Sequence, residues 1–513
     1  MLRCSAPLLA VLFLVSCGGE SSPPADAGLD MYRSGVLPSG EPMTALVGGD
    51  VPVVGTQFSC ENCHGRSGMG ASEGAYVIPP VAAQFLFEAS AQPERPAYDS
   101  ATLARVLREG ITPTGRELSP VLMPRYELSD SDVEVLESYL KTLSPGDSPG
   151  VDDSSIRFAT IFTEDTDPAE RDAVLVVLKR FFEDVNRQTR NDSARWDRGY
   201  SPESKLPTVF REWVLDEWTL RGKPGSWPAQ LEEFYATANV FAVVSGLGNE
   251  SWAPVANFCE QNEVPCLYPS VDLPHHEDGD FYTVYFSGGL LLEAGLIAQH
   301  LADNPASSVT QVYCDDRFEP AAAALRESLG NVSVSELKFN CDTPLPAAEI
   351  EGGATVLWLN EDQINGLPDS PPGDRHYISS TLLDAKIPET LALANAAVYM
   401  AHPYRLPGKS DAALRRFQLW ARTRDIEITS PRHQAEAFFS CLVVKDVVKH
   451  MGRFRIREYA LDMLDHAEGL AAYLPYHARP SFGPGQRFIN KGGYVLPVIN
   501  GAPVTDEAEW ILP

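Results

Sequence analysis

The motif CENCH, at residues 60–64, combines the residue types and spacing that most directly suggest chemistry. Two thiols separated by two residues, followed at once by an imidazole, fit covalent haem attachment, half of a zinc site or a redox dithiol. A zinc site would need a second ligand pair nearby, but the next cysteine is Cys259. A thioredoxin-like dithiol would need a βαβ context, which the surrounding sequence lacks. The motif therefore predicts one covalent haem c, attached through Cys60 and Cys63 and ligated by His64.

A second iron ligand is expected later in the same region. Met123 and Pro124 precede an amphipathic segment with helical spacing, for which Ser129 is the predicted N-cap. A thioether paired with an imidazole raises the reduction potential of haem iron, which favours electron transfer. Met69 is a weaker candidate, because it lies only five residues after His64.

Residues 29–144 resemble the small class I cytochromes c, in which a loop methionine ligates iron just before the C-terminal helix. The resemblance implies a small all-α domain that carries electrons. It also implies that Cys60, Cys63, His64 and Met123 bind the haem. Such a domain would exchange electrons with a redox partner, for example a periplasmic dehydrogenase.

The first residues predict export. Arg3 precedes an apolar run over 5–16 that is too short to span a bilayer. The sequence LVSC, which ends at Cys17, resembles the lipobox of bacterial lipoproteins, and the alternative is an ordinary signal peptide with an incidental cysteine. The resemblance implies a signal over 1–17 and a lipid anchor on Cys17, in the outer membrane if the cell has two. Residues 18–28, GGESSPPADAG, predict a flexible tether.

The length and charge limit the remaining possibilities. A chain of 513 residues is expected to form several folding units, and a formal net charge of −29 disfavours nucleic acid as a partner. A segment rich in Pro, Gly, Ser and Asp predicts a linker over 145–155. After it, apolar strand-like runs alternate with helical periodicity, which predicts βαβ units and open parallel sheets.

Residues 156–513 resemble the type I periplasmic binding proteins, especially the branched-chain amino acid receptors of ABC importers. The matching stretches are VFAVVSGLGNESWAPVANFCEQNEVPCLYPS, FYTVYFSGGLLLEAGLIAQHL and SFGPGQRFINKGGYVLPVI. The resemblance implies two α/β lobes, about 156–280 plus 405–513 and about 281–404. A small ligand such as an amino acid, amide or carboxylate would bind between them. The acidic stretch TEDTDPAERD departs from the short Ser- and Gly-rich loop of that family, which counts against an ordinary amino acid.

Ligands of open α/β sheets bind at the carboxyl ends of strands, which gives the candidate ligand residues. The candidates are Gly248, Asn249 and Ser251 in an expected loop, Ser270 after the next strand, Tyr282 across the cleft and Asp315 after a third strand. Each has a structural alternative: a turn with a helix cap for 245–251, lobe core for Tyr282 and a helix cap for Asp315.

The remaining cysteines fit this fold, in an oxidising compartment where disulfides persist. Cys314 and Cys341 end consecutive strands of βαβ units, and Cys259 and Cys266 flank a helix-to-strand turn, so both pairs are disulfide candidates. Cys441 lies in an apolar helical segment and is expected to be a buried thiol.

Three hypotheses about function follow from the sequence. The main one is a lipid-anchored electron-transfer protein whose second module binds a small ligand or a redox partner. The alternative is a solute-binding receptor of an ABC-type uptake or sensing system with an accessory haem domain. An oxidoreductase that uses the haem as its internal electron acceptor is the least favoured, because the sequence lacks a motif for a second cofactor.

Overall fold

The computed structural model divides into two compact units, Met1–Ser144 and Pro145–Pro513. The structure describes residues 27–73, 76–91, 94–143, 146–197, 211–330, 332–343, 345–346, 350, 353–366, 372–384, 387, 396–406, 411–506 and 508–513. The predicted signal, the lipidation candidate Cys17 and most of the tether lie outside these residues. Within them, every helix is too short or too polar to cross a membrane.

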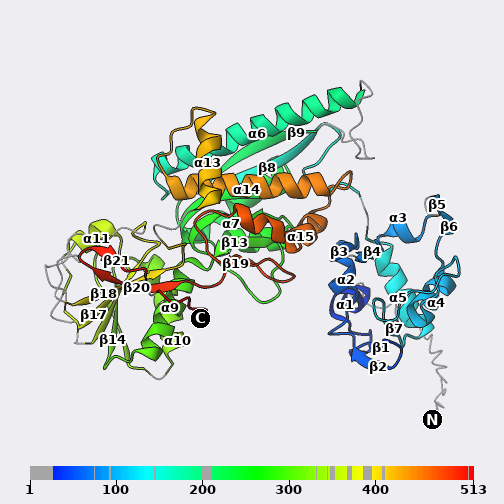
Figure 1. Ribbon diagram of the computed structural model, residues 1–513, viewed down its shortest axis with the longest axis horizontal. Helices are drawn as coiled ribbons and strands as arrows, with labels where there is room; N and C mark the ends of the chain where they lie inside the picture. Colours follow the sequence, from blue (N-terminus) through cyan, green and yellow to red (C-terminus); the bar gives the residue numbers. More distant parts are fainter. Residues whose placement is uncertain are drawn as a thin grey trace, which may run out of the picture. The chain divides into compact units, whose positions relative to one another are not determined.

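The first unit combines helices with short strands (Figure 1). Its helices are α1 (Ala27–Ser34), α2 (Cys60–His64), α3 (Ala83–Leu86), α4 (Ser100–Glu109) and α5 (Asp130–Leu140). Its strands are β1 (Thr44–Val47), β2 (Val51–Val54), β3 (Ala71–Glu73), β4 (Tyr76–Ile78), β5 (Ser90–Ala91), β6 (Glu94–Arg95) and β7 (Arg125–Tyr126). β2, β1 and β7 form a three-stranded sheet, and β3–β4 and β5–β6 form two-stranded ones. The expectation of an all-α unit is therefore wrong, because segments between the helices pair as short antiparallel strands.

Two local features build the core of this unit. Ser129 is the N-cap of α5, as predicted, and its Oγ accepts a hydrogen bond from the Asp132 amide at 3.2 Å. α1 crosses α5 at Gly28, where an added Cβ would lie 2.6 Å from the Tyr139 Cβ. Only glycine allows this close approach of the two helices.

The second unit contains two parallel-stranded lobes (Figure 1). The first lobe contains strands β8 (Ser155–Thr163), β9 (Glu212–Leu220), β10 (Ala242–Ser251), β11 (Cys266–Leu267), β12 (Ser270–Leu273), β13 (Thr283–Ser287) and β19 (Phe488–Asn490). Its helices are α6 (Pro168–Asp197), η1 (Pro224–Ser226), α7 (Trp227–Thr237), α8 (Ala253–Gln261), α13 (Ala412–Arg422), α14 (Pro431–His450), α15 (Arg457–Asp465) and η4 (Glu468–Tyr473). The strand order is β19-β13-β11-β10-β8-β9, with β12 also paired to β10.

The alternation of β8 shows why this sheet carries helices on both faces. Phe158 and Phe162 pack with buried residues of α6 and α14. Ala159 and Ile161, on the opposite face, pack with residues of α7 and α8. A strand that buries both faces must be apolar throughout, which explains the continuous apolar runs in the sequence.

The second lobe has the order β15-β14-β16-β17-β18-β20-β21. Its strands are β14 (Val309–Tyr313), β15 (Val334–Lys338), β16 (Ala354–Leu357), β17 (Arg375–Ser379), β18 (Ala397–His402), β20 (Tyr494–Ile499) and β21 (Ala502–Pro503). Its helices are α9 (Gly289–Asp303), η2 (Asp316–Phe318), α10 (Glu319–Leu329) and α11 (Glu361–Asn365). β20 and β21 join antiparallel, whereas the pairs from β15 to β18 are parallel.

The chain passes between the lobes three times: from β13 to α9, from β18 to α13 and from β19 to β20. The predicted lobe boundaries differ from this in two places. β13 belongs to the first lobe rather than the second, and β20 and β21 belong to the second rather than the first. The last crossing spans only a few residues, so composition does not signal it.

The segment 145–155, predicted as a linker, is part of the second unit in the structure. From Asp147 on, it packs onto the second unit: the Ser148 amide donates to the Arg455 carbonyl at 2.8 Å. Asp147 pairs with Arg211 at 2.8 Å, and Val151 bridges to Ile156. Its polar residues satisfy backbone and charged groups of the lobe instead of remaining in solvent.

Candidate functional site

The CENCH motif forms the short helix α2 of the first unit, with Cys60 and Cys63 three residues apart on it. His64, at its end, is buried, and its Nδ1 lies 2.9 Å from the Pro79 carbonyl oxygen. Because a carbonyl only accepts, this hydrogen bond requires a proton on Nδ1 and leaves Nε2 as the nitrogen with a free lone pair. Burial lowers the pKa of His64, which favours the neutral ring that binds metals.

The surroundings of α2 are apolar. Cys60 and Met123 pack against the same cluster of buried side chains, which includes Leu103 and Leu136. Burial raises the pKa of the Cys60 thiol to about 12, so it is not a thiolate poised for redox exchange. Cys60 and Met123 adjoin the apolar cluster, and Cys63 and His64 lie on the same short helix as Cys60. Thiols, an imidazole and a thioether suit a haem, whose faces are apolar and whose iron takes nitrogen and sulfur ligands. The donor set therefore fits the predicted haem c.

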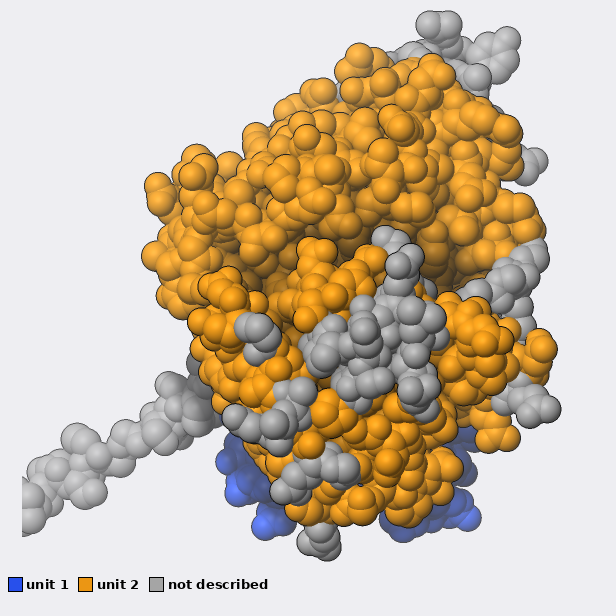
Figure 2. All heavy atoms as spheres, turned by 90° about the vertical axis from the view of Figure 1, so that its left-hand side faces the viewer, with its two compact units in different colours: residues 1–144 blue, residues 145–513 orange. Residues whose placement is uncertain are grey.

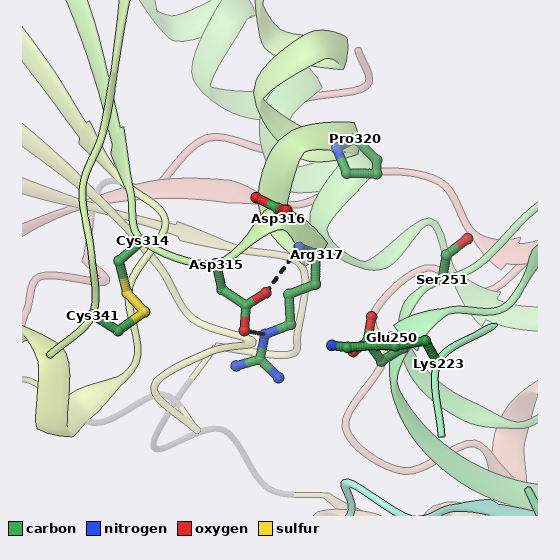
Figure 3. A pocket seen from close by; sticks show the side chains of 9 residues that line it. All are labelled: Lys223, Glu250, Ser251, Cys314, Asp315, Asp316, Arg317, Pro320 and Cys341. Atoms are coloured by element: carbon green, nitrogen blue, oxygen red, sulfur yellow. Dashed lines mark hydrogen bonds and ion pairs between the residues drawn. A yellow bond between two sulfur atoms is a disulfide. The ribbon is translucent and has the colours of Figure 1, made fainter. Parts of the chain in front are cut away.

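A groove crosses one face of the second unit, between its lobes (Figure 2). Residues of both lobes line a cleft of about 610 Å³, here called the interlobe cleft. The first lobe contributes Lys223, Glu250 and Ser251, and the second contributes Cys314, Asp315, Asp316, Arg317, Pro320 and Cys341. Figure 3 shows the Cys314–Cys341 disulfide on one side, Glu250 and Lys223 on the other, and the Arg317 guanidinium between them.

The charged groups of the interlobe cleft are partly matched within each lobe. The Lys223 ammonium donates to Glu250 Oε1 at 2.7 Å. Arg317 Nε lies 3.6 Å from Asp315 Oδ2, and the Asp315 side chain also accepts from the Arg317 amide at 3.0 Å. The cleft is thus polar, and an occupant must offer hydrogen bonds or charge.

A second set of polar groups lies where the lobes adjoin, and we call it the interlobe cluster. Its members are Asp272 on β12, Glu293 on α9, Thr381 after β17, Tyr404 after β18, and Arg432 and Glu436 on α14. It lies near the interlobe cleft, because Ser251, which lines that cleft, pairs with Leu273, the neighbour of Asp272 on β12.

Glu436 is held by three groups. Ser270 Oγ donates to Oε2 at 2.5 Å, His477 Nε2 donates to Oε1 at 2.9 Å, and Arg432 Nη1 lies 3.9 Å away. Burial alone would raise the pKa of Glu436, but the hydrogen bond from His477 and the charge of Arg432 lower it to about 2. Glu436 is therefore ionised, and its two oxygens already accept hydrogen bonds from protein groups.

The ligand candidates from the sequence divide into two groups. Ser251 and Asp315 line the interlobe cleft, although Asp315 also caps η2. Ser270 lies beside the interlobe cluster, where its hydroxyl donates a hydrogen bond to Glu436.

The other candidates have structural partners. The predicted loop 245–251 is strand: β10 continues to Ser251 with shifts of register at Gly246 and Ser251. Gly248 makes room for the Trp252 ring, 2.7 Å from an added Cβ, and the Asn249 side chain donates to the Asp165 carbonyl at 3.3 Å. Tyr282 lies in the core of the first lobe, where its hydroxyl donates to Glu458 at 2.8 Å.

Sequence reasoning missed Asp272, Glu293 and Arg432. A signal existed for two of them: Glu293 is the one charged residue in the run GLLLEAGLIA, and Arg432 precedes Glu436 by one turn in an apolar helix. Charges within such runs are costly unless partnered or functional.

Both disulfide candidates are bonded. Cys259 pairs with Cys266, and Cys314 pairs with Cys341, with Cα atoms 6.2 and 4.9 Å apart. Cys441 is fully buried on α14, and burial raises the pKa of its thiol. Within the part of the chain that the structure describes, no group of three or more His, Cys, Asp or Glu side chains could hold a metal ion.

Comparisons with known proteins found resemblance only in structure. No family model matches the chain, and no curated protein matches it. A branched-chain amino acid ABC transporter protein from Thermus thermophilus, solved with bound valine, aligns with 12% identity over 70% of this chain and 97% of its own, with a TM-score of 0.48. A fatty acid ABC transporter substrate-binding protein from Thermomonospora curvata aligns with 14% identity over 72% and 95%, also at 0.48. A leucine-binding protein from Thermotoga maritima aligns with 12% identity over 70% and 99%, at 0.45.

Proposed function

We propose that the second unit binds a small solute between its two lobes, as a substrate-binding protein does. The observation that carries this proposal is that both lobes contribute polar side chains to one cleft and one cluster, while the chain crosses between them three times. Crossings of this kind act as hinges, so the lobes can close on a ligand. The alternative hypothesis from the sequence thus becomes the leading one for this unit.

A solute screen tests this proposal. The full chain is mixed with amino acids, amides, small carboxylates, amines and fatty acids, and its melting temperature is measured. A ligand at one hundred times its Kd is expected to stabilise the folded state by about 2.7 kcal/mol. Hits are checked by calorimetry with Arg317→Ala, which removes a charge from the cleft, and with Arg453→Ala as a control on the surface. Absence of any hit, or equal affinity for both variants, contradicts binding in this cleft.

We further propose that the first unit is a c-type electron carrier with one haem. The supporting observation is the hydrogen bond from His64 Nδ1 to Pro79, which leaves Nε2 for iron. Cys60 and Cys63 would form the thioethers and Met123 would be the sixth ligand. Bound haem would supply one-electron transfer, and the partner would be a redox protein of the same compartment, with the chain tethered through Cys17.

Absorption spectroscopy of the full chain, produced with a haem-attachment system, tests this second proposal. A covalent, six-coordinate low-spin haem is expected, and Cys60→Ala with Cys63→Ala should abolish attachment. Met123→Ala should lose the low-spin spectrum, while the matched variant Met69→Ala keeps it. A five-coordinate spectrum in the unmodified chain, or an unchanged spectrum in Met123→Ala, would exclude Met123 as a ligand. Release of the Cys17→Ser variant from membranes tests the anchor.

A further inference from the structure

The Asp272 carboxylate has no ion pair and no side-chain hydrogen bond with any residue that the structure describes, although the residue is mostly buried. Four charged groups act on it: Arg432 of α14 and Arg317 of η2, which are positive, and Asp165 and Glu170, which are negative. Burial, the largest influence, raises the pKa of Asp272 to about 6. A carboxylate in this position has lost water without gaining a partner.

The two arginines near Asp272 already have partners. Arg432 lies 3.7 Å from Asp384 and 3.9 Å from Glu436, and its guanidinium lies over the Tyr404 ring at 5.4 Å. Arg317 is paired with Asp315, as described above. Since their charge is shared with these carboxylates, the region around Asp272 keeps a negative surplus that Asp165 and Glu170 increase.

Glu293 adjoins Asp272 from the other lobe. An added Cβ at Gly289, the first residue of α9, would lie 2.3 Å from the Asp272 carbonyl oxygen. Glu293 follows Gly289 by four residues and so projects from the same face of α9. Glu293 is 0% exposed, so its carboxyl is fully buried where α9 meets the first lobe.

One oxygen of Glu293 is saturated and the other is not. Oε1 accepts from the amide and the hydroxyl of Thr381 at 3.0 and 2.9 Å, and that hydroxyl also lies 3.0 Å from the Tyr404 hydroxyl. Among the described residues, Oε2 has no hydrogen-bond partner. Burial raises the pKa of Glu293 to about 8, and the negative charge of Asp272 adds to the effect, whereas the nearby Ser379 hydroxyl and the hydrogen bonds from Thr381 oppose it. The carboxyl is therefore mostly protonated at neutral pH.

We propose that the solute bound between the lobes carries a primary ammonium or guanidinium group, that Asp272 binds this group directly, and that Glu293 releases its proton to solvent when the group arrives. This inference rests on the proposed solute-binding function. A ligand cation supplies the N–H donors and the positive charge that Asp272 lacks. The same charge favours the ionised form of Glu293, so binding and proton release are linked.

Matched pairs of probes test the charge of the ligand. Putrescine is compared with 1,4-butanediol, cadaverine with 1,5-pentanediol and n-butylguanidine with n-butylurea, by calorimetry on the full chain. At least one cationic member is expected to bind about tenfold more tightly than its neutral partner. Asp272→Asn should weaken that binding by about tenfold or more, whereas the exposed loop variant Asp278→Asn should change it less than about twofold.

The role of Glu293 is tested by proton linkage with the best cationic probe. At pH 7 the binding enthalpy should depend on the ionisation enthalpy of the buffer, which reports proton release, and affinity should rise from pH 6 to pH 8 because the pKa of Glu293 is about 8. Glu293→Gln keeps the hydrogen bonds of Oε1 and should bind without release.

The outcomes separate this inference from the proposed function. A neutral probe that binds as tightly as its cationic partner, or unchanged binding by Asp272→Asn, overturns the cation assignment and leaves solute binding intact. Binding without proton release, or release that persists in Glu293→Gln, overturns the role of Glu293. If no cationic probe binds while the wider screen finds another solute, only the inference fails; if the screen also finds none, the proposed function fails with it.

Discussion

At the scale of single residues, Arg457 shows how one buried side chain can hold several backbone segments. It lies at the start of α15 and is only 4% exposed. Its guanidinium donates to six oxygens: those of Pro149, Val240, Phe241, Asn262 and Glu263, and the Tyr235 hydroxyl. The planar donor fork of arginine suits such a set of carbonyls, which lysine could not match.

We expect Arg457→Met to lower the free energy of unfolding of the second unit by about 3 kcal/mol, because several buried carbonyls lose their donor at once. Arg453→Met, at an exposed position on the preceding turn, should change it by less than about 0.5 kcal/mol. Calorimetric melting of both variants checks this. Equal melting temperatures for the two variants would show that water replaces the lost donor.

The site residues show a limit of sequence reasoning at the same scale. The types and spacing of Cys60, Cys63 and His64 are local, so their joint position on α2 could be predicted. Asp272 and Glu293 come from different lobes, and neither forms a motif with its sequence neighbours. Their significance depends on missing partners, which only the packed structure reveals.

At the scale of elements, the crossing of α1 and α5 depends on Gly28. The Val135 carbonyl oxygen and the Tyr139 Cβ lie 2.8 and 2.6 Å from where a Cβ would be, and Tyr32 contacts Tyr139 with ring centroids 5.4 Å apart. Backbone contact of this kind fixes the first helix to the last one in the unit.

Gly28→Val should separate α1 from α5 and destabilise the first unit by about 1–3 kcal/mol. Gly225→Ala is the control, because nothing lies within 4 Å of the added Cβ there and the backbone is not left-handed. Thermal denaturation followed by circular dichroism measures both. A Gly28→Val variant as stable as the control would mean that α1 moves aside at little cost.

At the scale of the whole molecule, the second unit is built as two sheets joined by three crossings, and each disulfide lies within one lobe. No covalent link therefore holds the lobes at one angle beyond the crossings themselves, within the residues that the structure describes. Relative motion of the lobes is the expected response to a ligand.

Hydrogen exchange of the full chain, with the ligand found by the screen, tests this closure. Amides near Glu250 in the first lobe and near Asp315 in the second should both exchange at least about fivefold more slowly when ligand is bound. Peptides around Asp216, on the outer strand β9, serve as the internal control. Protection confined to one lobe would contradict closure and indicate binding to that lobe alone.

The sequence by itself determined what depends on neighbours in the chain. The CENCH helix, the Ser129 cap, the division near residue 144 and the apolar strands β8 and β10 all follow from local spacing and composition. The tertiary structure decided which strands share a lobe, because the crossing from β19 to β20 has no compositional signal. It also brought Asp272, Glu293 and Arg432 together, since burial and unmatched charge arise only when distant segments pack against one another.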